Sequence, residues 1–335
     1  MELSGRSDGP PLAPPATLVA GLRELGARLA GHGVDVDPLA VCCERAAIVG
    51  LTRGGDKSCG RMTRLVPARG GWIAVSLARA DDIASIPAWL ERDATEDPWI
   101  AVADEVAQRD AAEIVMRARL LGMPAAVLGE IAATLPVRAA TLGPGRKFGA
   151  GRKLEQLTVV DLSSLWAGPL CSRLLRDAGA RVIKVESTQR PDATRRSSPE
   201  FFACMNDGKE QIAIDFQTDE LRAQLEQADV VIEASRPRAL EQLGIRPEDV
   251  CPRVWVSITG YGRAAPGRDW VAFGDDAAVA GGLVVWDETG PCFCLDAVAD
   301  PLTGMTAALA ALDALGKNDR VLLDVAMARV AAQYA

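Results

Sequence analysis

Glu186 and Gly168 are the residues whose types and spacing first suggest chemistry in this chain. Glu186 ends an apolar run, where an acidic side chain in a nucleotide-binding sheet would bind a ribose hydroxyl. Gly168 lies in the turn Ala167-Gly168-Pro169, which would bring backbone close to a phosphate group. However, the G-x-G-x-x-G fingerprint of a dinucleotide site is missing, because Gly168 stands alone between alanine and proline. We therefore expect a nucleotide-binding half-site, with a nicotinamide or flavin enzyme as one alternative.

One strand–turn–helix–strand unit would position this turn. Residues 157–162 form a short β-branched run that is typical of a buried parallel strand. Pro169 favours the start of a helix over 168–178, and Gly179 favours its end. Residues 181–186 then predict the next strand. Further strands are predicted at 229–233, 254–259 and 321–325, and further helices at 218–227 and 303–315. Such alternation indicates a parallel sheet with helices on its faces.

Composition excludes several classes of function. The chain has 335 residues, of which 49% are apolar and 24% charged, so it is long enough for two globular domains. A net charge of −8 argues against nucleic acid and anionic membrane as partners. No apolar run approaches a bilayer span, and no signal-peptide core is present, so we expect a cytoplasmic protein. Eight cysteines without CxxC spacing and a lone histidine, His32, predict neither a disulfide framework nor a metal site.

The predicted fold class is α/β, with a Rossmann-like parallel sheet domain and a smaller α+β domain. Residues 1–16 are rich in Pro, Gly and Ser and are predicted to form a flexible tail. Residues 17–140 are predicted to form the small domain, and residues 154–335 the Rossmann-like domain. Helices are predicted at 17–31, 38–49, 81–90, 100–108 and 110–121, and strands at 72–77 and 123–128. Residues 141–153 predict a linker; a phosphate loop is the alternative, but P-loop spacing is absent.

A string of motifs in the second half resembles the family III CoA-transferases, a family that also includes CoA-dependent racemases and carnitine-type CoA enzymes. The motifs, in family order, are Asp161-Leu-Ser…Ala-Gly-Pro169, Gly179-Ala-Arg-Val-Ile-Lys-Val-Glu186, Asn206-Asp-Gly-Lys-Glu-Gln-Ile-Ala-Ile-Asp215, Ala228-Asp-Val-Val-Ile-Glu-Ala-Ser-Arg-Pro237, Leu243-Gly-Ile245, Val256-Ser-Ile-Thr-Gly-Tyr-Gly262, Ala299-Asp-Pro-Leu-Thr-Gly304 and Leu323-Asp-Val325. Together they cover nearly all of 155–328. The resemblance implies a Rossmann-like CoA-binding domain over 154–335 that transfers CoA between an acyl-CoA and a carboxylic acid, without a metal.

The first half resembles the small domain of the same family. The similar segments are Gly70-Gly-Trp-Ile-Ala-Val75, Asp110-Ala-Ala-Glu-Ile-Val115 and Leu120-Leu-Gly-Met-Pro-Ala-Ala126. In the family this domain follows the nucleotide-binding part, whereas here it precedes that part. We interpret the order as a permuted or fused arrangement, or as a chain that lacks a piece past Ala335. The resemblance also implies a homodimer, because family members form interlocked dimers.

The resemblance implies that Asp300 is the catalytic nucleophile. Its carboxylate would attack a thioester, giving an acyl–aspartyl anhydride and then an enzyme–CoA thioester. Taken alone, an aspartate before Pro301 and an apolar run also predicts an ordinary helix N-cap. The two roles are compatible, since a helix N-terminus stabilises a carboxylate. For the oxyanion, the candidates are Gly54, Gly55 and Gly60, or Gly281 and Gly282, although each of these also suits a plain turn.

Histidine separates the two chemistries of the family. The racemase branch places a histidine shortly after the strand that ends in Gly-Tyr-Gly, whereas this chain has Arg268 there. His32 lies far away in the sequence, in a predicted surface loop. We therefore expect transferase chemistry, which needs no histidine, and disfavour a racemase.

The resemblance also implies which residues line the CoA site. They are Leu165, Trp166, Ala167, Lys184, Lys209, Ala234 and Ser235. Trp166 is expected either to stack on adenine or to pack in the core. Lys184 and Lys209, with Arg195 and Arg196, are expected to neutralise phosphates or to be solvated. Ala234-Ser235 replaces the usual Asn-Phe of the family, so a CoA-binding homologue that has lost turnover is the alternative hypothesis.

Overall fold

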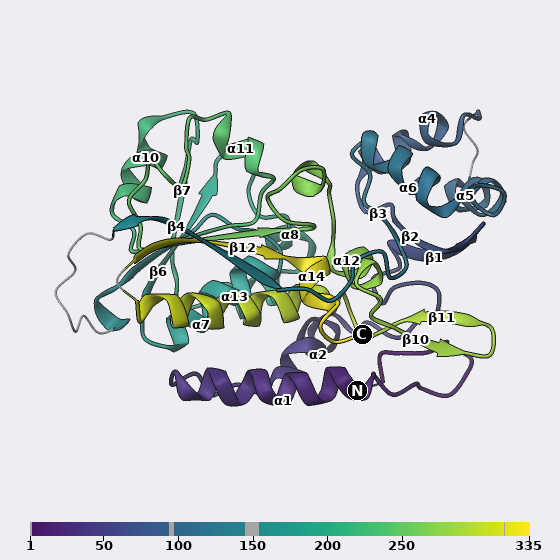
Figure 1. The fold of residues 1–335 in the computed structure, drawn as a ribbon, viewed down its shortest axis with the longest axis horizontal. Helices are drawn as coiled ribbons and strands as arrows, with labels where there is room; N and C mark the ends of the chain where they lie inside the picture. Colours follow the sequence, from purple (N-terminus) through teal and green to yellow (C-terminus); the bar gives the residue numbers. More distant parts are fainter. Residues whose placement is uncertain (1, 94–96, 145–153, 318) are drawn as a thin grey trace.

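The computed structural model describes residues 2–93, 97–144, 154–317 and 319–335. A seven-stranded sheet forms the centre of its larger part (Figure 1). The strands are β4 (Val137–Pro144), β5 (Thr158–Asp161), β6 (Arg181–Ser187), β7 (Glu210–Ile214), β8 (Val230–Glu233), β9 (Val254–Thr259) and β12 (Asp319–Ala326). Their order is β4-β12-β9-β8-β5-β6-β7, and every neighbouring pair is parallel except β4 with β12. The predicted α/β class and the predicted parallel sheet are confirmed.

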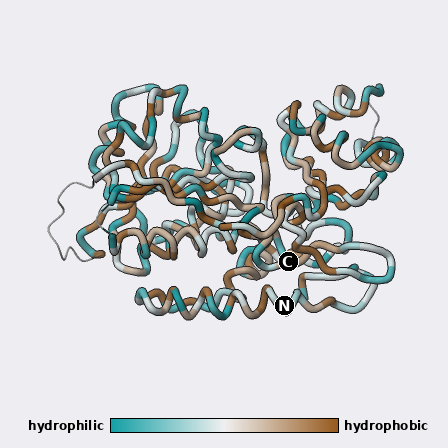
Figure 2. Tube along the Cα trace, in the orientation of Figure 1, coloured by the Kyte–Doolittle hydropathy of each residue, from teal (hydrophilic) through white to brown (hydrophobic). Residues whose placement is uncertain are grey.

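Apolar residues on both faces of this sheet explain why it is covered on both sides. On β5, Val159 packs with α7 (Ala167–Asp177) and α13 (Ala299–Leu315), while its neighbour Val160 packs on the opposite face with α10 (Asp219–Glu226) and α11 (Pro237–Glu241). Successive residues of a strand point to opposite faces, so a continuous β-branched run is buried on both. The hydrophobic residues accordingly gather along the sheet in Figure 2.

The connections of the sheet reverse direction between β5 and β8. From β5 the chain passes through α7 to β6, and from β8 it passes through α11 to β9, on the other side of the pair. In doubly wound sheets, ligands bind in the crevice at the carboxyl ends of the two strands where this reversal occurs. The fold thus directs attention to the residues that follow Asp161 and Glu233.

A smaller unit lies beside the large sheet, at the upper right of Figure 1. Its antiparallel sheet has the order β1-β2-β3, with β1 (Thr63–Ala68), β2 (Gly71–Ser76) and β3 (Ala125–Val127). Its helices are α3 (Ala80–Ala84), α4 (Ile86–Leu90), α5 (Pro98–Val106) and α6 (Ala111–Leu120). These elements enclose a separate core around the buried Trp89. The hairpin of β10 (Val284–Asp287) and β11 (Gly290–Phe293) lies below this unit in Figure 1.

The hydrophobic cores divide the chain differently from the predicted domains. Helices α1 (Ala16–Gly31) and α2 (Pro38–Val49) are present as predicted, but they pack on α13 of the large part and share its core. Strand β4, assigned to the small domain and the linker, joins the large sheet. Helical periodicity shows which face of α1 is apolar, but it does not show which unit that face covers. Residues 145–153 of the predicted linker lie outside the described residues.

Residues 2–15, predicted as a flexible tail, make specific contacts. Leu3 and Ser4 are buried, and the Gly55 N–H donates to Gly5 O over 3.0 Å. The Arg53 side chain donates to the carbonyl oxygens of Arg6 and Gly9, over 2.9 Å in both cases. Proline and glycine here shape a fixed turn that a composition count does not distinguish from a mobile segment.

The remaining elements are short. They are η1 (Leu154–Gln156), α8 (Thr194–Ser197), α9 (Pro199–Asn206), η2 (Gly267–Asp269), α12 (Gly274–Ala280) and α14 (Met327–Ala331). Within the described ranges, none of the helices combines the length and the apolar character that crossing a membrane requires.

Candidate active site

Asp300 lies in the first turn of α13, one residue inside the helix. The N-cap residue is Val298, and no side chain caps this end, so Asp300 does not act as the N-cap. Its carboxylate instead accepts a hydrogen bond from the backbone N–H of Gly274, the first residue of α12. A β-carbon at residue 274 would lie 2.3 Å from Asp300 Oδ2 and 2.4 Å from Ala297 O. Glycine is therefore required for α12 to approach the carboxylate so closely.

Further acidic groups and one arginine surround Asp300. Asp275 and Asp276 come from α12, and the fully buried Asp296 precedes α13. Arg45 of α2 binds Asp296 with both ends of its guanidinium, Nε to Oδ2 over 2.7 Å and Nη2 to Oδ1 over 2.5 Å. Such a bidentate pair fixes both the position and the orientation of the guanidinium.

These neighbours set the charge of Asp300 near neutral pH. Burial raises the pKa of Asp300 to about 7, the charge of Arg45 opposes that rise, and the charges of Asp275 and Asp296 add to it. Burial and the charge of Asp296 likewise raise the pKa of Asp275 to about 6. Burial holds the pKa of Asp276 well above its usual range. A carboxyl group that titrates near pH 7 within such a cluster is a candidate functional group.

Three of the candidate oxyanion glycines already use their N–H groups in hydrogen bonds within the protein. Gly55, Gly281 and Gly282 donate to the backbone oxygens of Gly5, Ala277 and Val279, respectively, and so are occupied. Gly60 lies beside Arg45, since a β-carbon at residue 60 would be 3.9 Å from Arg45 Nη2. Gly60 is therefore the candidate that the structure brings near Arg45.

Lys184 and Lys209, predicted to neutralise phosphates, lie inside the protein. Lys209 Nζ donates to Ser172 Oγ (2.7 Å), Asn206 Oδ1 (2.9 Å) and Pro169 O (2.9 Å), and lies 3.3 Å from Asp161 Oδ2. Burial lowers the pKa of Lys209 to about 8, and the charge of Asp161 opposes that shift.

Lys184 is held in the same way. Its Nζ donates to Ser163 O over 2.6 Å and lies 3.3 Å from Asp192 Oδ2, and both side chains are fully buried. Both lysines thus hold the turn after β5 from within the protein. The sequence does not show this arrangement, because it does not indicate which acidic side chains fold against each lysine.

The residues of the turn after β5 divide into buried and exposed ones. Trp166 is only 2% exposed; Phe201 packs against its ring edge-to-face at 5.3 Å, and Arg45 lies over the ring at 5.2 Å. It therefore packs in the core and is not free to stack on adenine. Ala167 is buried as well, whereas Leu165 is 40% exposed.

The exposed residues follow strands β5 and β8, at the carboxyl ends where the sheet reverses. Ala234 is exposed, and a β-carbon on Gly168 would lie 3.7 Å from its Cβ. Ser235 is half-buried, and its hydroxyl donates to Glu233 Oε2 over 3.1 Å. Of the seven predicted CoA-lining residues, Leu165 and Ala234 are exposed and Ser235 is half-buried.

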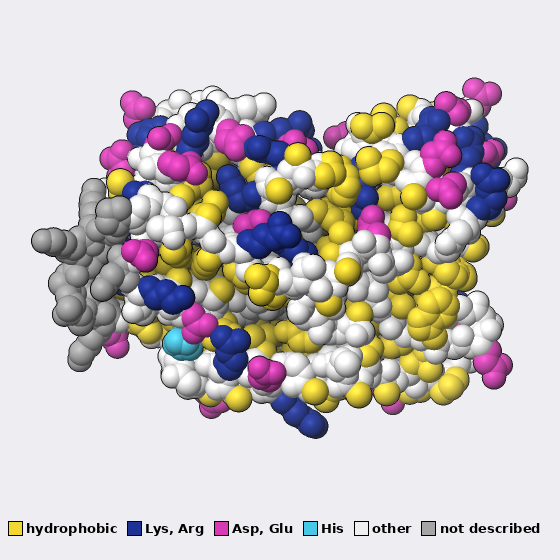
Figure 3. Space-filling model, in the orientation of Figure 1, with side chains coloured by type: hydrophobic (Ala, Val, Ile, Leu, Met, Phe, Trp, Pro, Cys, Tyr) yellow, Lys and Arg dark blue, Asp and Glu magenta, His cyan; other side chains and the backbone are white. Residues whose placement is uncertain are grey.

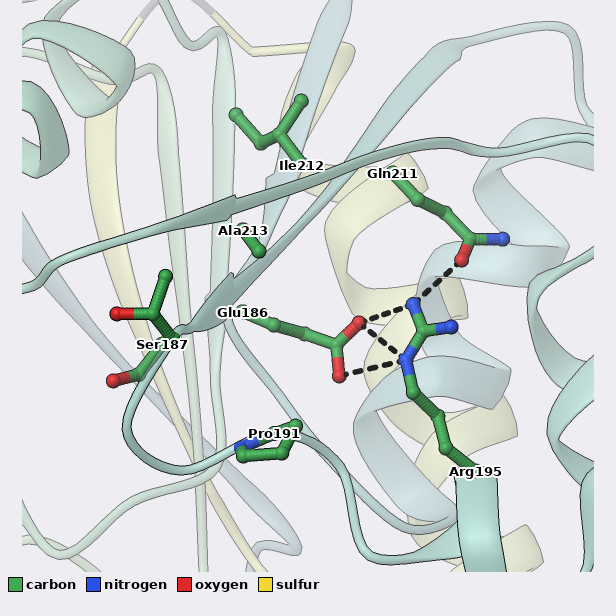
Figure 4. Close-up of a pocket in the computed structure, with 8 residues that line it drawn as sticks. Glu186, Ser187, Pro191, Arg195, Gln211, Ile212 and Ala213 are labelled. Carbon is green, nitrogen blue, oxygen red and sulfur yellow. Dashed lines mark hydrogen bonds and ion pairs between the residues drawn. The ribbon is translucent and has the colours of Figure 1, made fainter.

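Glu186 lies in a pocket at the carboxyl ends of β6 and β7 (Figure 4). The Arg195 guanidinium donates to its carboxylate, Nη2 to Oε2 over 2.5 Å, and also to Gln211 Oε1 over 2.7 Å. The Asp192 N–H donates to Glu186 Oε1 over 2.8 Å. Burial raises the pKa of Glu186, but these hydrogen bonds and nearby cations bring it below its usual range. The carboxylate is thus already satisfied within the protein, which disfavours its predicted role toward a ribose.

A basic cleft that the sequence does not predict lies between the two parts of the molecule. The small unit contributes Arg79 and Arg119, and the large part contributes Arg236, Arg238 and Trp270, among other residues. The cleft has a volume of about 470 Å³. It opens between the two lobes, where Figure 3 shows a notch. Only folding brings these arginines together, so spacing in the sequence does not show them as one group.

Arg236 is the least neutralised of these cations. Its pKa is lowered first by burial and then by the charges of Arg238 and Arg79, although Asp269 opposes the shift. Arg79 and Arg119 are neutralised by Asp82 and Glu130, and Arg238 lies 3.8 Å from Asp269. Arg236 directly follows Ser235 in the chain, so it connects the segment after β8 to the lining of the cleft.

The doubly wound sheet, its reversal at β5 and β8 and the aspartate at the start of α13 define an α/β protein with a candidate nucleotide crevice and a candidate catalytic carboxylate. Residues 154–333 match the model of CoA-transferase family III, and the chain belongs to that family. This finding confirms the resemblance seen in the sequence.

Individual relatives also match only part of the chain. An acyl-CoA transferase of Fusarium pseudograminearum is 32% identical over 41% of this chain and 36% of its own length. Succinyl-CoA–D-citramalate CoA-transferase of Chloroflexus aurantiacus is 30% identical over 50% and 46%. Among solved structures, a CAIB/BAIF family protein of Brucella suis is 30% identical over 53% of this chain and 54% of that one, with a TM-score of 0.49. The chain spans about half, or less, of the length of the curated relatives it matches.

Proposed function

We propose that this protein transfers CoA between an acyl-CoA thioester and a carboxylic acid, with Asp300 as the nucleophile. One observation carries the proposal: Asp300, at the position of the family nucleophile, is half-buried against a glycine and has a pKa of about 7. Such a carboxylate is ionised in part at neutral pH while its surroundings limit water, and a covalent relay needs both conditions.

In the proposed reaction, Asp300 first attacks the thioester carbonyl, the C–S bond breaks, and CoA leaves as the thiolate. The product is an acyl–aspartyl anhydride. The thiolate then attacks the Asp300 carbonyl carbon, the donor leaves as its carboxylate, and an enzyme–CoA thioester remains. The acceptor carboxylate repeats the two steps in reverse, which yields the acceptor thioester and free Asp300. No electron is transferred, and no metal is needed.

We place CoA at the crevice between β5 and β8. Leu165, Ala234 and Ser235 would contact it there, and Arg236 in the adjoining basic cleft would face its phosphates. Phosphate groups favour a cluster of arginines because of their charge and their forked hydrogen-bond geometry. We further propose a homodimer, as the family resemblance implies, in the cytoplasm, where the eight free cysteines would stay reduced.

The other candidate function is a CoA-binding homologue without turnover. Burial of Lys184 and Lys209 and the replacement at Ala234-Ser235 favour it, because they remove expected ligand contacts. A racemase is disfavoured further, since Arg268 Nη2 donates to both carboxylate oxygens of Glu241, over 2.8 and 2.7 Å. Arg268 thus stands, paired, where a racemase would have its histidine.

The two candidates are separated by trapping the intermediate. The protein is incubated with a panel of acyl-CoAs, quenched with hydroxylamine or borohydride, and digested for mass spectrometry. A transferase gives a modified peptide at Asp300, and Asp300→Asn gives none. Binding of CoA by the unmodified protein, with no adduct from any thioester, would establish the homologue without turnover instead.

A further inference from the structure

The loop before α13 holds two residues in an unfavourable backbone conformation. Leu295 has φ 58° and Ala297 has φ 42°, both in the left-handed region that residues other than glycine rarely adopt. Such residues persist only where the surrounding structure holds them, and they cluster at functional sites. Residues 295–297 lead directly into the helix that carries Asp300, and the Asp300 N–H donates to Ala297 O over 2.9 Å.

The N-terminal segment supplies most of the contacts that hold this loop. The Leu295 N–H donates to Ser4 Oγ over 3.0 Å, and the Cys59 thiol donates to Leu295 O over 3.5 Å. Asp296 lies between Leu295 and Ala297, and its carboxylate accepts hydrogen bonds from both Nε and Nη2 of Arg45. From the large part, Asp275 Oδ1 accepts from the Ala297 N–H over 3.1 Å.

Arg45 is itself fixed from a second side. Its guanidinium lies 5.2 Å from the ring centroid of the buried Trp166, and the charges of Asp296, Asp275 and Asp300 all act on it. A guanidinium held by a carboxylate fork and an aromatic face has few other orientations available. The preceding residue, Glu44, pairs with a different partner, and its Oε2 lies 2.9 Å from Arg173 Nη1.

We propose that Arg45 is a positioning residue for Asp300: through Asp296 it holds the loop 295–297, and its charge favours the ionised form of the Asp300 carboxylate. The proposal rests on the proposed function, since it assigns Arg45 to the nucleophile of that reaction. It also means that the segment preceding the family-matched region completes the site within the same chain.

The charged groups around Asp300 determine in which direction its pKa moves when the charge of Arg45 is removed. Asp275 and Asp276 of α12 and Asp296 of the loop are acidic, Arg45 is basic, and the Cys59 thiol faces Asp275, Asp296 and Arg45. Removing the positive charge leaves the acidic groups unopposed and so raises the pKa of Asp300 above about 7. Less of the nucleophile is then ionised at neutral pH.

The test is a titration of Asp300 that requires no turnover. The protein is labelled with ¹³C at the aspartate carboxyls, and Asp300→Asn assigns the signal. In Arg45→Gln we expect the midpoint to rise by roughly one pH unit or more, a tenfold change in the ionisation equilibrium. Glu44→Gln, which breaks the neighbouring ion pair of α2, is the matched control and should leave the midpoint in place. An unchanged midpoint in Arg45→Gln overturns the proposal.

Arg45→Lys covers the case in which Arg45→Gln does not fold. Lysine keeps the charge but loses the fork, so we expect faster hydrogen exchange at the Leu295 and Ala297 amides and a midpoint closer to the parent value. Parent-like exchange together with a parent-like midpoint contradicts the proposal. The failure of this proposal can be distinguished from the failure of the proposed function. If Arg45→Gln shifts the midpoint but the parent protein forms no Asp300 adduct, the role of Arg45 stands and the transferase reaction is ruled out.

Discussion

Gly274 and Asp300 are so close that a β-carbon on residue 274 would come within 2.3 Å of Asp300 Oδ2. The same approach lets the Gly274 N–H hold the carboxylate. Gly274 thus fixes the nucleophile by its lack of a side chain as well as by its hydrogen bond.

Gly274→Ala should displace the Asp300 carboxylate. We expect adduct formation at Asp300 to be lost and the free energy of unfolding to fall by about 1–3 kcal/mol, the usual effect of overpacking. Denaturant unfolding and the trapping reaction measure the two effects. Gly31→Ala on α1 is the control, because a β-carbon there meets nothing within 4 Å. Adduct formation at the parent rate in Gly274→Ala would show that the close approach is not needed.

The rate of adduct formation should fall as pH decreases through about 7. The pKa of Asp300 lies near that value, and the protonated acid is a poor nucleophile. Single-turnover rates with a saturating acyl-CoA between pH 5.5 and 8.5 test this expectation. A rate that stays flat down to pH 5 would mean that a carboxylate with an ordinary pKa performs the attack.

The raised pKa of Asp300 also affects stability, but in the opposite direction: stability falls as pH increases, whereas the rate rises. Because the pKa of Asp300 is higher in the folded protein than in the unfolded chain, its protonated form stabilises the fold fully at pH values below about 4, and this contribution is lost as pH rises to about 7. Asp300→Asn, which stays neutral, should therefore lose less stability than the parent between pH 4 and 7. Parallel melting curves for the two proteins across this range would contradict the shifted pKa.

Lys209→Met separates a structural lysine from a phosphate ligand. Removing the ammonium leaves the buried Asp161 uncompensated, so we expect a loss of about 3–5 kcal/mol in the free energy of unfolding. Arg196→Met, at an exposed position, should change it by less than about 0.5 kcal/mol. A Lys209→Met protein of parent stability that has lost CoA affinity would return Lys209 to the ligand site.

Arg236→Gln should weaken the binding of CoA through its phosphates. Loss of one phosphate-facing cation is expected to raise the Kd about tenfold, while the affinity for pantetheine, which has no phosphate, stays the same. Calorimetric titration with both ligands measures this, with Arg28→Gln on α1 as the control. An equal loss for CoA and pantetheine would indicate that Arg236 shapes the crevice instead of facing phosphates.

The sequence predicts the large sheet well because its signals are local. Runs such as 157–162 and 254–259 are rich in apolar and β-branched residues, a composition that is typical of strands buried on both faces. Turn residues such as Pro169 and Gly179 mark where α7 begins and where its connection to β6 turns. These features do not depend on what the rest of the chain does.

The candidate site is less predictable because the residues that form its ion pairs are far apart in the sequence. Arg45 and Asp296 meet only after α2 docks on α13, and nothing in either segment indicates the other. Lys184 and Lys209 look like exposed ligands in a motif, but Asp192 and Asp161 fold against them. In the sequence, Gly274 is notable only as a glycine followed by two aspartates. Its importance becomes clear once α13 is seen to approach it closely.

An oxygen-18 transfer measurement tests the role of Asp300 most directly. The protein turns over an acyl-CoA with an acceptor acid whose carboxylate carries ¹⁸O, and the peptide that contains Asp300 is then analysed by mass spectrometry. The acceptor carboxylate attacks the aspartyl thioester, and attack of CoA on the acceptor carbonyl then leaves the bridging oxygen on Asp300. We therefore predict that Asp300 acquires one ¹⁸O atom in the first turnover. Formation of the acceptor thioester with no ¹⁸O in Asp300 would contradict it.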